Sequence, residues 1–311
     1  MPIPPIIAFD YLFAPNAQKA RNYLFLTKTP FSICEQPFAL PRPDLTGLGI
    51  TYRRVPVLCI GKDVFPDNAS FLAAMQELLK KESKALRESH LDSVYEAWGY
   101  RSFWLALPCL PGEFMTPQLA KDRANLFPVF AREDFGKLQP SARSEFRAFL
   151  DGAEEGFLSN TTDAAPFVGG EKEAGMADVF AVWIIKWWVE TIGLAEETGH
   201  GRNLFPKMWR WLENIPKQVD GEKEQKKIPV EEATKQLLSS AYAMPDIGID
   251  KNDTLGLKEG ERVSIEASDA VPGTHPQYGK LVGLNKAKTV IELENGLRMH
   301  FPKVGYFVEK A

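Results

Sequence analysis

The side chains that most often carry nucleophilic or metal chemistry are few in this chain and stand far apart. Its four histidines and three cysteines are His90, His200, His275, His300, Cys34, Cys59 and Cys109. The histidines show no spacing that suits a metal site or a catalytic triad, so the sequence predicts no metal. The cysteines lie in apolar runs without zinc-type spacing, which indicates buried thiols in a reducing compartment and not a disulfide framework.

Pro56 is the most informative single residue, because it lies inside the apolar run 54–60. A proline cannot donate a backbone hydrogen bond within a central strand, so Pro56 is expected to open a strand. Upstream, the pattern predicts a buried strand over Ile6 to Tyr11, a turn at Ala14 to Ala17 and a helix from Gln18 to Leu26. A strand, a turn, a helix and an X-Pro strand in this order form a thioredoxin-like outline.

Three short segments in this stretch resemble motifs of the glutathione S-transferase superfamily, and they occur in the family's order. Phe13 to Arg21 stands where many members carry Ser-Pro-x-Ser/Ala-x-Lys-x-Arg. Val55-Pro56 stands where the family has a cis proline, and Phe65 to Ser70 stands at the place of its pair of an acidic and a hydroxyl residue. The resemblance covers Ile6 to Leu79 and implies a glutathione-binding domain.

The resemblance implies glutathione as the cofactor and a set of residues that would hold it. The residue before the cis proline offers its backbone to the cysteinyl part, and an acidic pair receives the γ-glutamyl end at a helix N-terminus. Asp67 fits that pattern, whereas Asn68 replaces the hydroxyl residue. Arg54, with Arg53, is a candidate for the glycyl carboxylate, and solvated surface charge is the alternative. The predicted binding residues are Val55, Pro56, Asp67, Asn68 and Arg54.

The same resemblance leaves the glutathione thiolate without its usual partner. Serine-type members place a hydroxyl before the proline of the first motif, but this chain has Ala14 there. Asn16 is the first candidate to replace it, because its amide carries N–H donors. A role as a turn residue or helix cap is the alternative for Asn16. Tyr11 is the second candidate, since tyrosine-type members use a phenol near the end of the first strand, and packing at a domain seam is its alternative role.

Beyond Leu79 the sequence changes to apolar residues at helical spacing, broken by proline and glycine. Its most apolar part, Val179 to Val189, is shorter than the ~20 residues that cross a bilayer, so a central core helix is expected. The expected helices span 70–91, 93–107, 117–130, 142–158, 176–192 and 202–215, which predicts an all-helical second domain. The resemblance implies an acceptor pocket beside the first helical pair of this domain. Its predicted residues are Tyr95, Trp98, Arg101 and Trp104, and core packing is the alternative role for part of this set.

From about Leu257 the pattern turns to short β-like segments at 262–265, 279–284, 289–293 and 297–301, with a hairpin signal at Glu294 to Gly296. The predicted fold class is therefore α/β plus all-α plus small β. It combines a thioredoxin-like domain (residues 1–83), a helical glutathione-transferase domain (84–245) and an appended small β-barrel-like domain (246–311). Some fungal transferase-like proteins resemble this three-part arrangement, which implies a link to fungal secondary metabolism.

Composition and charge are ordinary for an intracellular protein of more than one domain. The chain of 311 residues has a formal net charge of −4 and a pI near 5.8. Neither nucleic acid nor an anionic membrane is therefore the expected partner. No signal peptide is apparent at the N-terminus, so a cytoplasmic location is expected. The resemblance also implies a homodimer.

The leading hypothesis is a glutathione S-transferase-like enzyme that binds glutathione and acts on a small apolar or aromatic electrophile. One alternative is an isomerase or dehydratase of a biosynthetic intermediate on the same fold. The other is a non-catalytic binding or scaffold protein. Loss of the hydroxyl at Ala14 is compatible with the first alternative. The appended β domain, and Gly175 in place of a hydroxyl residue at the start of the core helix, favour the second.

Overall fold

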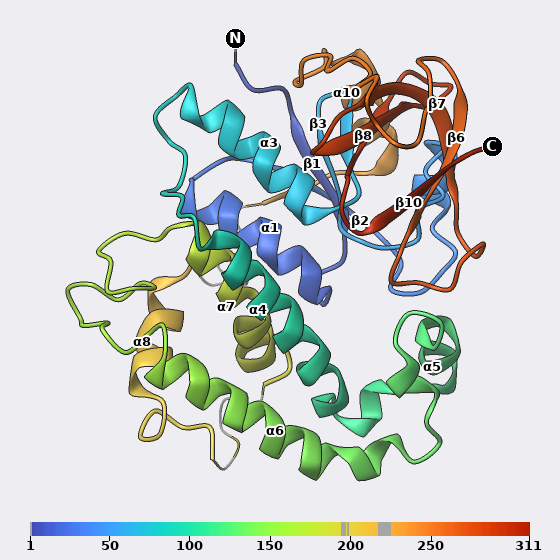
Figure 1. Ribbon diagram of the computed structural model, residues 1–311. Helices are drawn as coiled ribbons and strands as arrows, with labels where there is room; N and C mark the ends of the chain where they lie inside the picture. Colours follow the sequence, from blue (N-terminus) through green and yellow to red (C-terminus); the bar gives the residue numbers. More distant parts are fainter. Residues whose placement is uncertain (1, 194–196, 198, 217–224) are drawn as a thin grey trace. The chain divides into compact units, whose positions relative to one another are not determined.

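The computed structural model describes residues 2–193, 197, 199–216 and 225–311 (Figure 1). The chain forms two compact units, and the division between them falls within helix α1 (Pro15–Leu26). The first unit holds Met1–Ala17, Pro30–Ser83 and Glu224–Ala311, and the second holds the remaining stretches, Gln18–Thr29 and Lys84–Lys223. The C-terminal segment therefore belongs to the same unit as most of the predicted thioredoxin-like segment.

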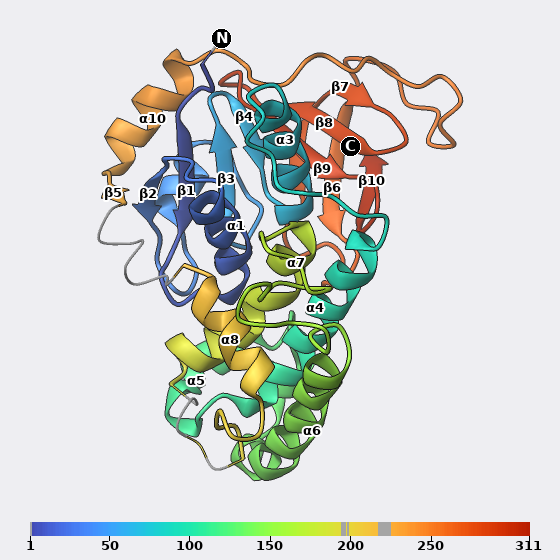
Figure 2. The ribbon, with the colours of Figure 1, turned by 90° about the vertical axis from the view of Figure 1, so that its left-hand side faces the viewer.

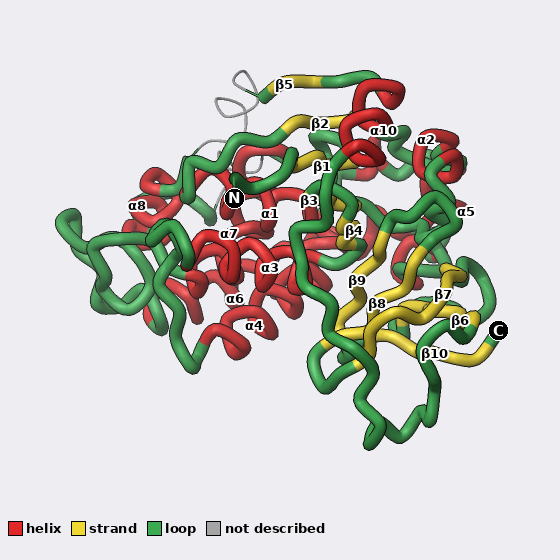
Figure 3. Tube along the Cα trace, turned by 90° about the horizontal axis from the view of Figure 1, so that it is seen from above, coloured by secondary structure: helices red, strands yellow, loops and turns green. Residues whose placement is uncertain are grey.

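One sheet of ten strands runs through the first unit. Figure 2 and Figure 3 show its strands from two sides. Its strand order is β10-β6-β7-β8-β9-β4-β3-β1-β2-β5. Strands β1 and β2 are parallel, whereas β1 and β3, and then β3 and β4, are antiparallel. The strands are β1 (Ile6–Asp10), β2 (Ser32–Glu35), β3 (Val57–Ile60), β4 (Asp63–Phe65), β5 (Lys226–Lys227), β6 (Arg262–Ala267), β7 (Gln277–Leu284), β8 (Lys288–Glu292), β9 (Arg298–Pro302) and β10 (Tyr306–Lys310).

Strands β1 and β3 are buried along their whole length, which indicates that both faces of this part of the sheet are covered. Ile7, Phe9 and Val57 point to one face, where they share an apolar core with α10 (Val230–Ser239). The residues that alternate with these along β1 and β3 point to the other face, since side chains alternate along a strand. On that second face, α3 (Asn68–Lys80) contacts β4 and β9 (Figure 2).

The β-rich C-terminal region is confirmed. Strands β6 to β9 lie where the sequence predicted them, and Asn295 and Gly296 form the turn of the β8–β9 hairpin. Gly296 has a φ of 81°, a value that glycine adopts without a steric cost. Strand β10 was not predicted. Because β4 pairs with β9 in parallel, the C-terminal strands continue the N-terminal sheet.

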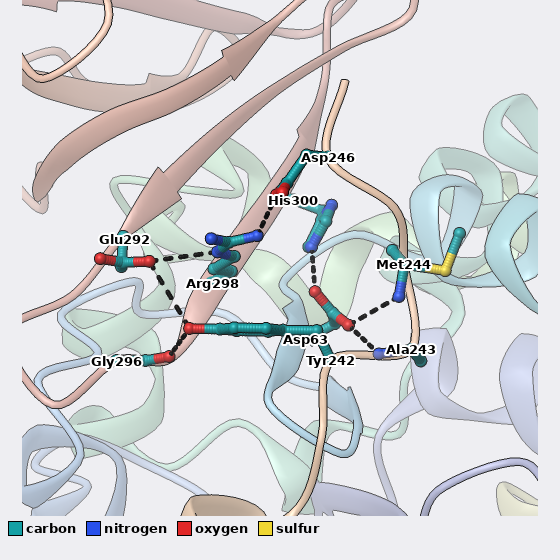
Figure 4. A network of polar contacts seen from close by, with 9 residues as sticks. All are labelled: Asp63, Tyr242, Ala243, Met244, Asp246, Glu292, Gly296, Arg298 and His300. Atoms are coloured by element: carbon teal, nitrogen blue, oxygen red, sulfur yellow. Dashed lines mark hydrogen bonds and ion pairs between the residues drawn. The ribbon is translucent and has the colours of Figure 1, made fainter. Parts of the chain in front are cut away.

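The join between β4 and β9 has a buried carboxylate at its centre (Figure 4). Oδ1 of Asp63 lies 2.7 Å from Nε2 of His300. Oδ2 of Asp63 accepts hydrogen bonds from the N–H groups of Ala243 at 2.6 Å and Met244 at 2.9 Å. Asp63 thereby ties β4 to β9 and to the segment that follows α10. Beside it, the guanidinium of Arg298 contacts three further side chains: Glu292, Asp246 and Tyr242.

The described elements of the second unit include five α-helices, as expected for a helical domain. All eleven residues of α7 are buried, which confirms the predicted core helix. Among the described residues, no helix is both long enough and apolar enough to cross a bilayer. The helices are α4 (Asp92–Ala106), α5 (Pro117–Arg123), α6 (Phe135–Glu155), α7 (Met176–Lys186) and α8 (Pro206–Asn214), drawn in Figure 1.

Two predicted helices were too long. The helix expected over 70–91 ends at Lys80, because Leu79 is the last buried residue of α3 and residues 81–84 are exposed, so no apolar face continues. The helix expected over 117–130 stops at Arg123, and a short 3₁₀ turn begins at Pro128, where a proline cannot supply the hydrogen bond of a continuing helix.

The buried pair of Asp63 and His300 predicts a pH-dependent stability. Burial lowers the pKa of His300 below its ordinary value of 6.5, an effect that Asp63 partly offsets. Nδ1 of His300 has no hydrogen-bond partner within the described residues, so a proton added there would be buried without an acceptor. The unfolded chain therefore takes up this proton first, and the free energy of unfolding should fall as the pH drops from about 7.5 to about 5.5.

Chemical denaturation across this pH range measures the effect. His300→Gln keeps an N–H donor for Asp63 but cannot titrate, so its stability should depend less on pH. His90→Gln removes an exposed histidine and is the matched control that should keep the wild-type slope. Equal slopes in wild type and His300→Gln would show that His300 does not carry the dependence.

Candidate functional site

The starts of two helices meet in the first unit. Helix α1 begins at Pro15, a residue that suits the first helical position because its ring presets φ. Helix α3 begins at Asn68, whose side-chain amide donates a hydrogen bond of 2.9 Å to the backbone oxygen of Asn16. Because of this bond, the two helix N-termini that the sequence assigned to glutathione lie next to each other.

Asp67 caps helix α3 and makes a second, long-range contact. Its backbone is extended, and its Oδ1 accepts a hydrogen bond of 2.8 Å from the N–H of Ala69, which is the usual geometry of an N-cap. Its Oδ2 accepts a hydrogen bond of 3.1 Å from the hydroxyl of Tyr306, in strand β10. Asp67 is partly exposed, so the carboxylate is held in place while solvent still reaches the residue.

Val55 and Pro56 have the backbone geometry that the resemblance implies. The peptide bond between them is cis. Pro56 is buried, and β3 begins at the next residue, so Pro56 opens a strand as predicted. Val55 is partly buried and packs against the apolar core of the first unit.

Arg54 already has an acidic partner in the chain. Its guanidinium forms an ion pair of 2.7 Å with Asp269, which lies in the loop between β6 and β7. Both side chains are partly exposed, at 26% and 35%. The predicted contact of Arg54 with a glycyl carboxylate therefore requires that this ion pair be shared or replaced.

The residues assigned to the thiolate lie around the start of α1. Ala14 is 1% exposed, and its methyl group offers no hydrogen bond. Asn16 is partly buried, and its side-chain amide makes no hydrogen bond within the described part of the chain. The ring of Tyr11 meets the ring of Phe38 edge-on at 5.0 Å, a packing contact within the first unit.

The four residues assigned to an acceptor pocket all lie on α4 in the second unit. They do not share one environment, because a helix turns by about 100° per residue. Tyr95, Trp98 and Trp104 are partly buried against other aromatic rings of the unit, whereas Arg101 is exposed. The ring partners are Phe157 for Tyr95, Phe149 and Phe157 for Trp98, and Phe127 for Trp104.

Two tyrosines beside this site were not predicted from the sequence. The hydroxyls of Tyr52 and Tyr306 lie 3.1 Å apart, and Tyr306 in turn contacts Asp67. Burial raises the pKa of Tyr52 to about 12 and holds that of Tyr306 well above 10, so both phenols stay protonated. Tyr52 lies four residues before Pro56, and this short distance in sequence was a signal that could have identified it as a site residue. Nothing in the local sequence connects Tyr306 with a residue 239 positions away.

The described residues contain neither a metal site nor a cysteine suited to nucleophilic chemistry. No group of histidine, cysteine, aspartate and glutamate side chains there could hold a metal ion. The three cysteines are free and buried, as predicted. Burial raises the pKa of Cys34 to about 11 and that of Cys109 to about 12, so these thiols are protonated and weakly reactive.

Comparisons with known proteins agree with this architecture. Residues 105–224 match the model of a domain of unknown function (DUF7962). The structure is similar over 99% of the chain to the whole of a GST-like protein from Pseudomonas syringae, with 22% identity and a TM-score of 0.71. It is also similar to glutaredoxin 2 from Salmonella typhimurium in complex with glutathione, with 14% identity, coverage of 70% of this chain and 95% of that chain, and a TM-score of 0.51. No curated protein matches the chain. The fold is that of glutathione S-transferase-like proteins.

The capping bond of Asp67 predicts a separate effect on stability. Asp67→Ala should lower the free energy of unfolding by about 1 kcal/mol, because the N–H of Ala69 loses its acceptor. Asp67→Asn is the matched control, since asparagine caps helices about as well as aspartate. Urea denaturation of the three proteins measures the difference. If both variants lost the same stability, the capping bond would not be the cause.

Proposed function

We propose that this chain is a glutathione S-transferase-like enzyme that binds glutathione in its first unit. The observation that carries the proposal is the hydrogen bond from Asn68 to the backbone of Asn16, because it joins the two helix starts that would receive the thiolate and the γ-glutamyl end of the same ligand. Helix N-termini attract anions through their free N–H groups and the helix dipole. Glutathione carries a thiolate and carboxylates that such groups can receive.

Each part of the ligand has a proposed partner. The backbone of Val55, before Pro56, pairs with the cysteinyl part, as the resemblance implies. The N–H groups at the start of α3, near Asn68, receive the γ-glutamyl carboxylate, while the carboxylate of Asp67 receives the adjacent ammonium group. Arg54 meets the glycyl carboxylate in exchange for part of its ion pair with Asp269. A similar fold holds glutathione in the glutaredoxin 2 complex.

The mechanism requires that the protein stabilise the thiolate of bound glutathione. A free thiol has a pKa of ~8.5, and lowering it by ~2 units requires ~2.7 kcal/mol of preferential stabilisation of the thiolate. The N-terminus of α1 contributes ~0.3–1 kcal/mol, or up to ~2 in a partly buried geometry. A charge-assisted hydrogen bond from the amide of Asn16 adds ~1.5–3 kcal/mol. These two sources together reach the required magnitude without a hydroxyl at position 14.

The proposed second substrate is a small apolar or aromatic electrophile. Aromatic side chains on α4 offer flat apolar surface, and the exposed Arg101 adds a positive charge that suits an anionic acceptor. We propose that the residues in this role are Tyr95, Trp98, Arg101 and Trp104.

One observation favours a second function. Ala14 is buried and has only a methyl group where serine-type relatives have their catalytic hydroxyl. A protein with this change could hold glutathione without conjugating it. It would then act as an isomerase or dehydratase of a biosynthetic intermediate, or as a non-catalytic binding protein.

We also propose the three-part division of the chain into residues 1–83, 84–245 and 246–311, with distinct tasks. The first part binds glutathione and the helical part supplies the acceptor residues. The third part shares one sheet with the first, so it supports the glutathione site more directly than a free appendage would.

Calorimetric titration with glutathione tests the proposal. Wild type should bind, and Asp67→Asn should bind about tenfold more weakly, because it keeps the helix cap but loses the charge that faces the ammonium group. A conjugation assay with a general aromatic electrophile then separates the two functions, since binding without turnover favours the second. Absence of binding by wild type would remove the proposal, and equal affinities of the two proteins would remove the role of Asp67.

Ala14→Ser should restore a donor beside the sulfur of bound glutathione. The hydroxyl should lower the pKa of the bound thiol and raise the fraction of thiolate at neutral pH. The ultraviolet absorbance of the thiolate, followed during a pH titration of the complex, measures this shift. Ala14→Gly alters the same position without adding a donor and is the control. An unchanged titration in Ala14→Ser would argue that position 14 does not face the sulfur.

A further inference from the structure

The C-terminal region holds the segment that leads into Pro56. Gln277, at the start of β7, accepts a hydrogen bond of 2.8 Å from the N–H of Thr51 and donates one of 3.0 Å to the backbone oxygen of Gly49. The side chain of Gln277 is buried, so these bonds are shielded from water. Asp269 adds the ion pair with Arg54. Residues far along the chain therefore set the position of residues 49–54.

The same region reaches the proposed γ-glutamyl site through the phenol of Tyr306, which also contacts the phenol of Tyr52. A carboxylate can only accept hydrogen bonds, so the hydroxyl of Tyr306 donates to Oδ2 of Asp67. The oxygen of Tyr306 is then free to accept the proton of the Tyr52 hydroxyl, 3.1 Å away. Because burial keeps both phenols protonated, these donor and acceptor roles hold at neutral pH.

Packing fixes the position of the Tyr306 hydroxyl. The ring of Tyr306 lies 5.2 Å from that of Phe301 in β9 and 6.3 Å from that of Tyr52. Its backbone pairs with Ala267 of β6, and β10 forms one end of the sheet (Figure 3). A side chain held by rings on two sides and by a strand register has few other rotamers, so its hydroxyl is a fixed donor.

We propose that Tyr306 is a positioning residue that orients the Asp67 carboxylate toward the ammonium group of the γ-glutamyl end of glutathione. This inference rests on the proposed function and deepens it. The N–H of Ala69 holds Oδ1 and the Tyr306 hydroxyl holds Oδ2, so the plane of the carboxylate is set from both sides. The two oxygens of a carboxylate have about four acceptor sites, and two remain for the ligand.

This arrangement makes the C-terminal strand part of ligand selection. In glutathione the γ-linked glutamyl residue has a free α-amino group, which gains a charge-assisted bond to the oriented Asp67. An analogue that lacks this amino group gains no such bond. The preference for glutathione over that analogue, glutaryl-cysteinyl-glycine, therefore reports on the orientation of Asp67. General loss of structure would weaken the binding of both ligands and leave their ratio nearly unchanged.

The experiment measures the affinities of the full chain for glutathione and for glutaryl-cysteinyl-glycine by calorimetry. Wild type should prefer glutathione by about tenfold or more, and Tyr306→Phe should lose most of that preference, because Oδ2 of Asp67 loses its donor. Tyr52→Phe should reduce the preference by about two- to threefold, since it removes only the donor to Tyr306. Tyr278→Phe changes a tyrosine that stacks with Arg262 on a neighbouring strand and is the matched control, with the preference intact.

Each failure has a different meaning. If wild type binds neither ligand, the proposed function fails, and the inference fails with it. If wild type prefers glutathione and Tyr306→Phe keeps the same preference, the proposed function stands and the role of Tyr306 is overturned. Tighter binding of glutathione by Tyr306→Phe would also overturn it, because the phenol would then occupy the place of the ammonium group. If Tyr306→Phe does not fold, Tyr52→Phe decides, and an unchanged preference in that variant overturns the inference.

Discussion

The parallel pairing of β4 with β9 is the constraint on which the first unit depends. Strand β4 has only three residues, and without β9 it would be the open edge of the sheet. An exposed edge has unpaired N–H and C=O groups, and β9 pairs with this edge. Four further strands of the C-terminal region, β8, β7, β6 and β10, follow β9 in the sheet. Asp63 sits at this join and binds His300 of β9 together with two backbone N–H groups of the segment after α10.

The consequence for the candidate site follows from chain connectivity. Strand β4 ends at Phe65, and two residues later Asp67 begins the approach to α3. Anchoring β4 on β9 therefore also fixes the start of α3 against the C-terminal strands. Tyr306, only a few residues after β9, then comes within hydrogen-bond distance of Asp67. One pairing between distant segments thus decides which side chains surround the proposed γ-glutamyl site.

Asp67 combines two tasks that pull in different directions. As a helix cap it stabilises α3, and as the proposed partner of an ammonium group it must remain reachable by a ligand. A carboxylate can do both because its two oxygens accept several hydrogen bonds in different directions. Asn68 also has two roles, because it begins α3 and contacts the start of α1. Its side chain, which replaces the hydroxyl of the family pattern, bridges to Asn16 and so links the two helix starts.

The sequence by itself determined the features whose causes act within a few residues. Pro56 opens a strand because of its missing N–H, Asn295-Gly296 makes a hairpin because glycine tolerates a positive φ, and the apolar run of α7 marks a core helix. Resemblance of short motifs added the glutathione hypothesis. Only the tertiary structure decided the end of α3 at Lys80, the continuation of the sheet from β4 into β9, and the contact between Tyr306 and Asp67. These features depend on which distant surfaces bury each other. The free energy that selects them comes from packing across the whole unit, and local propensity and residue spacing carry no information about that packing.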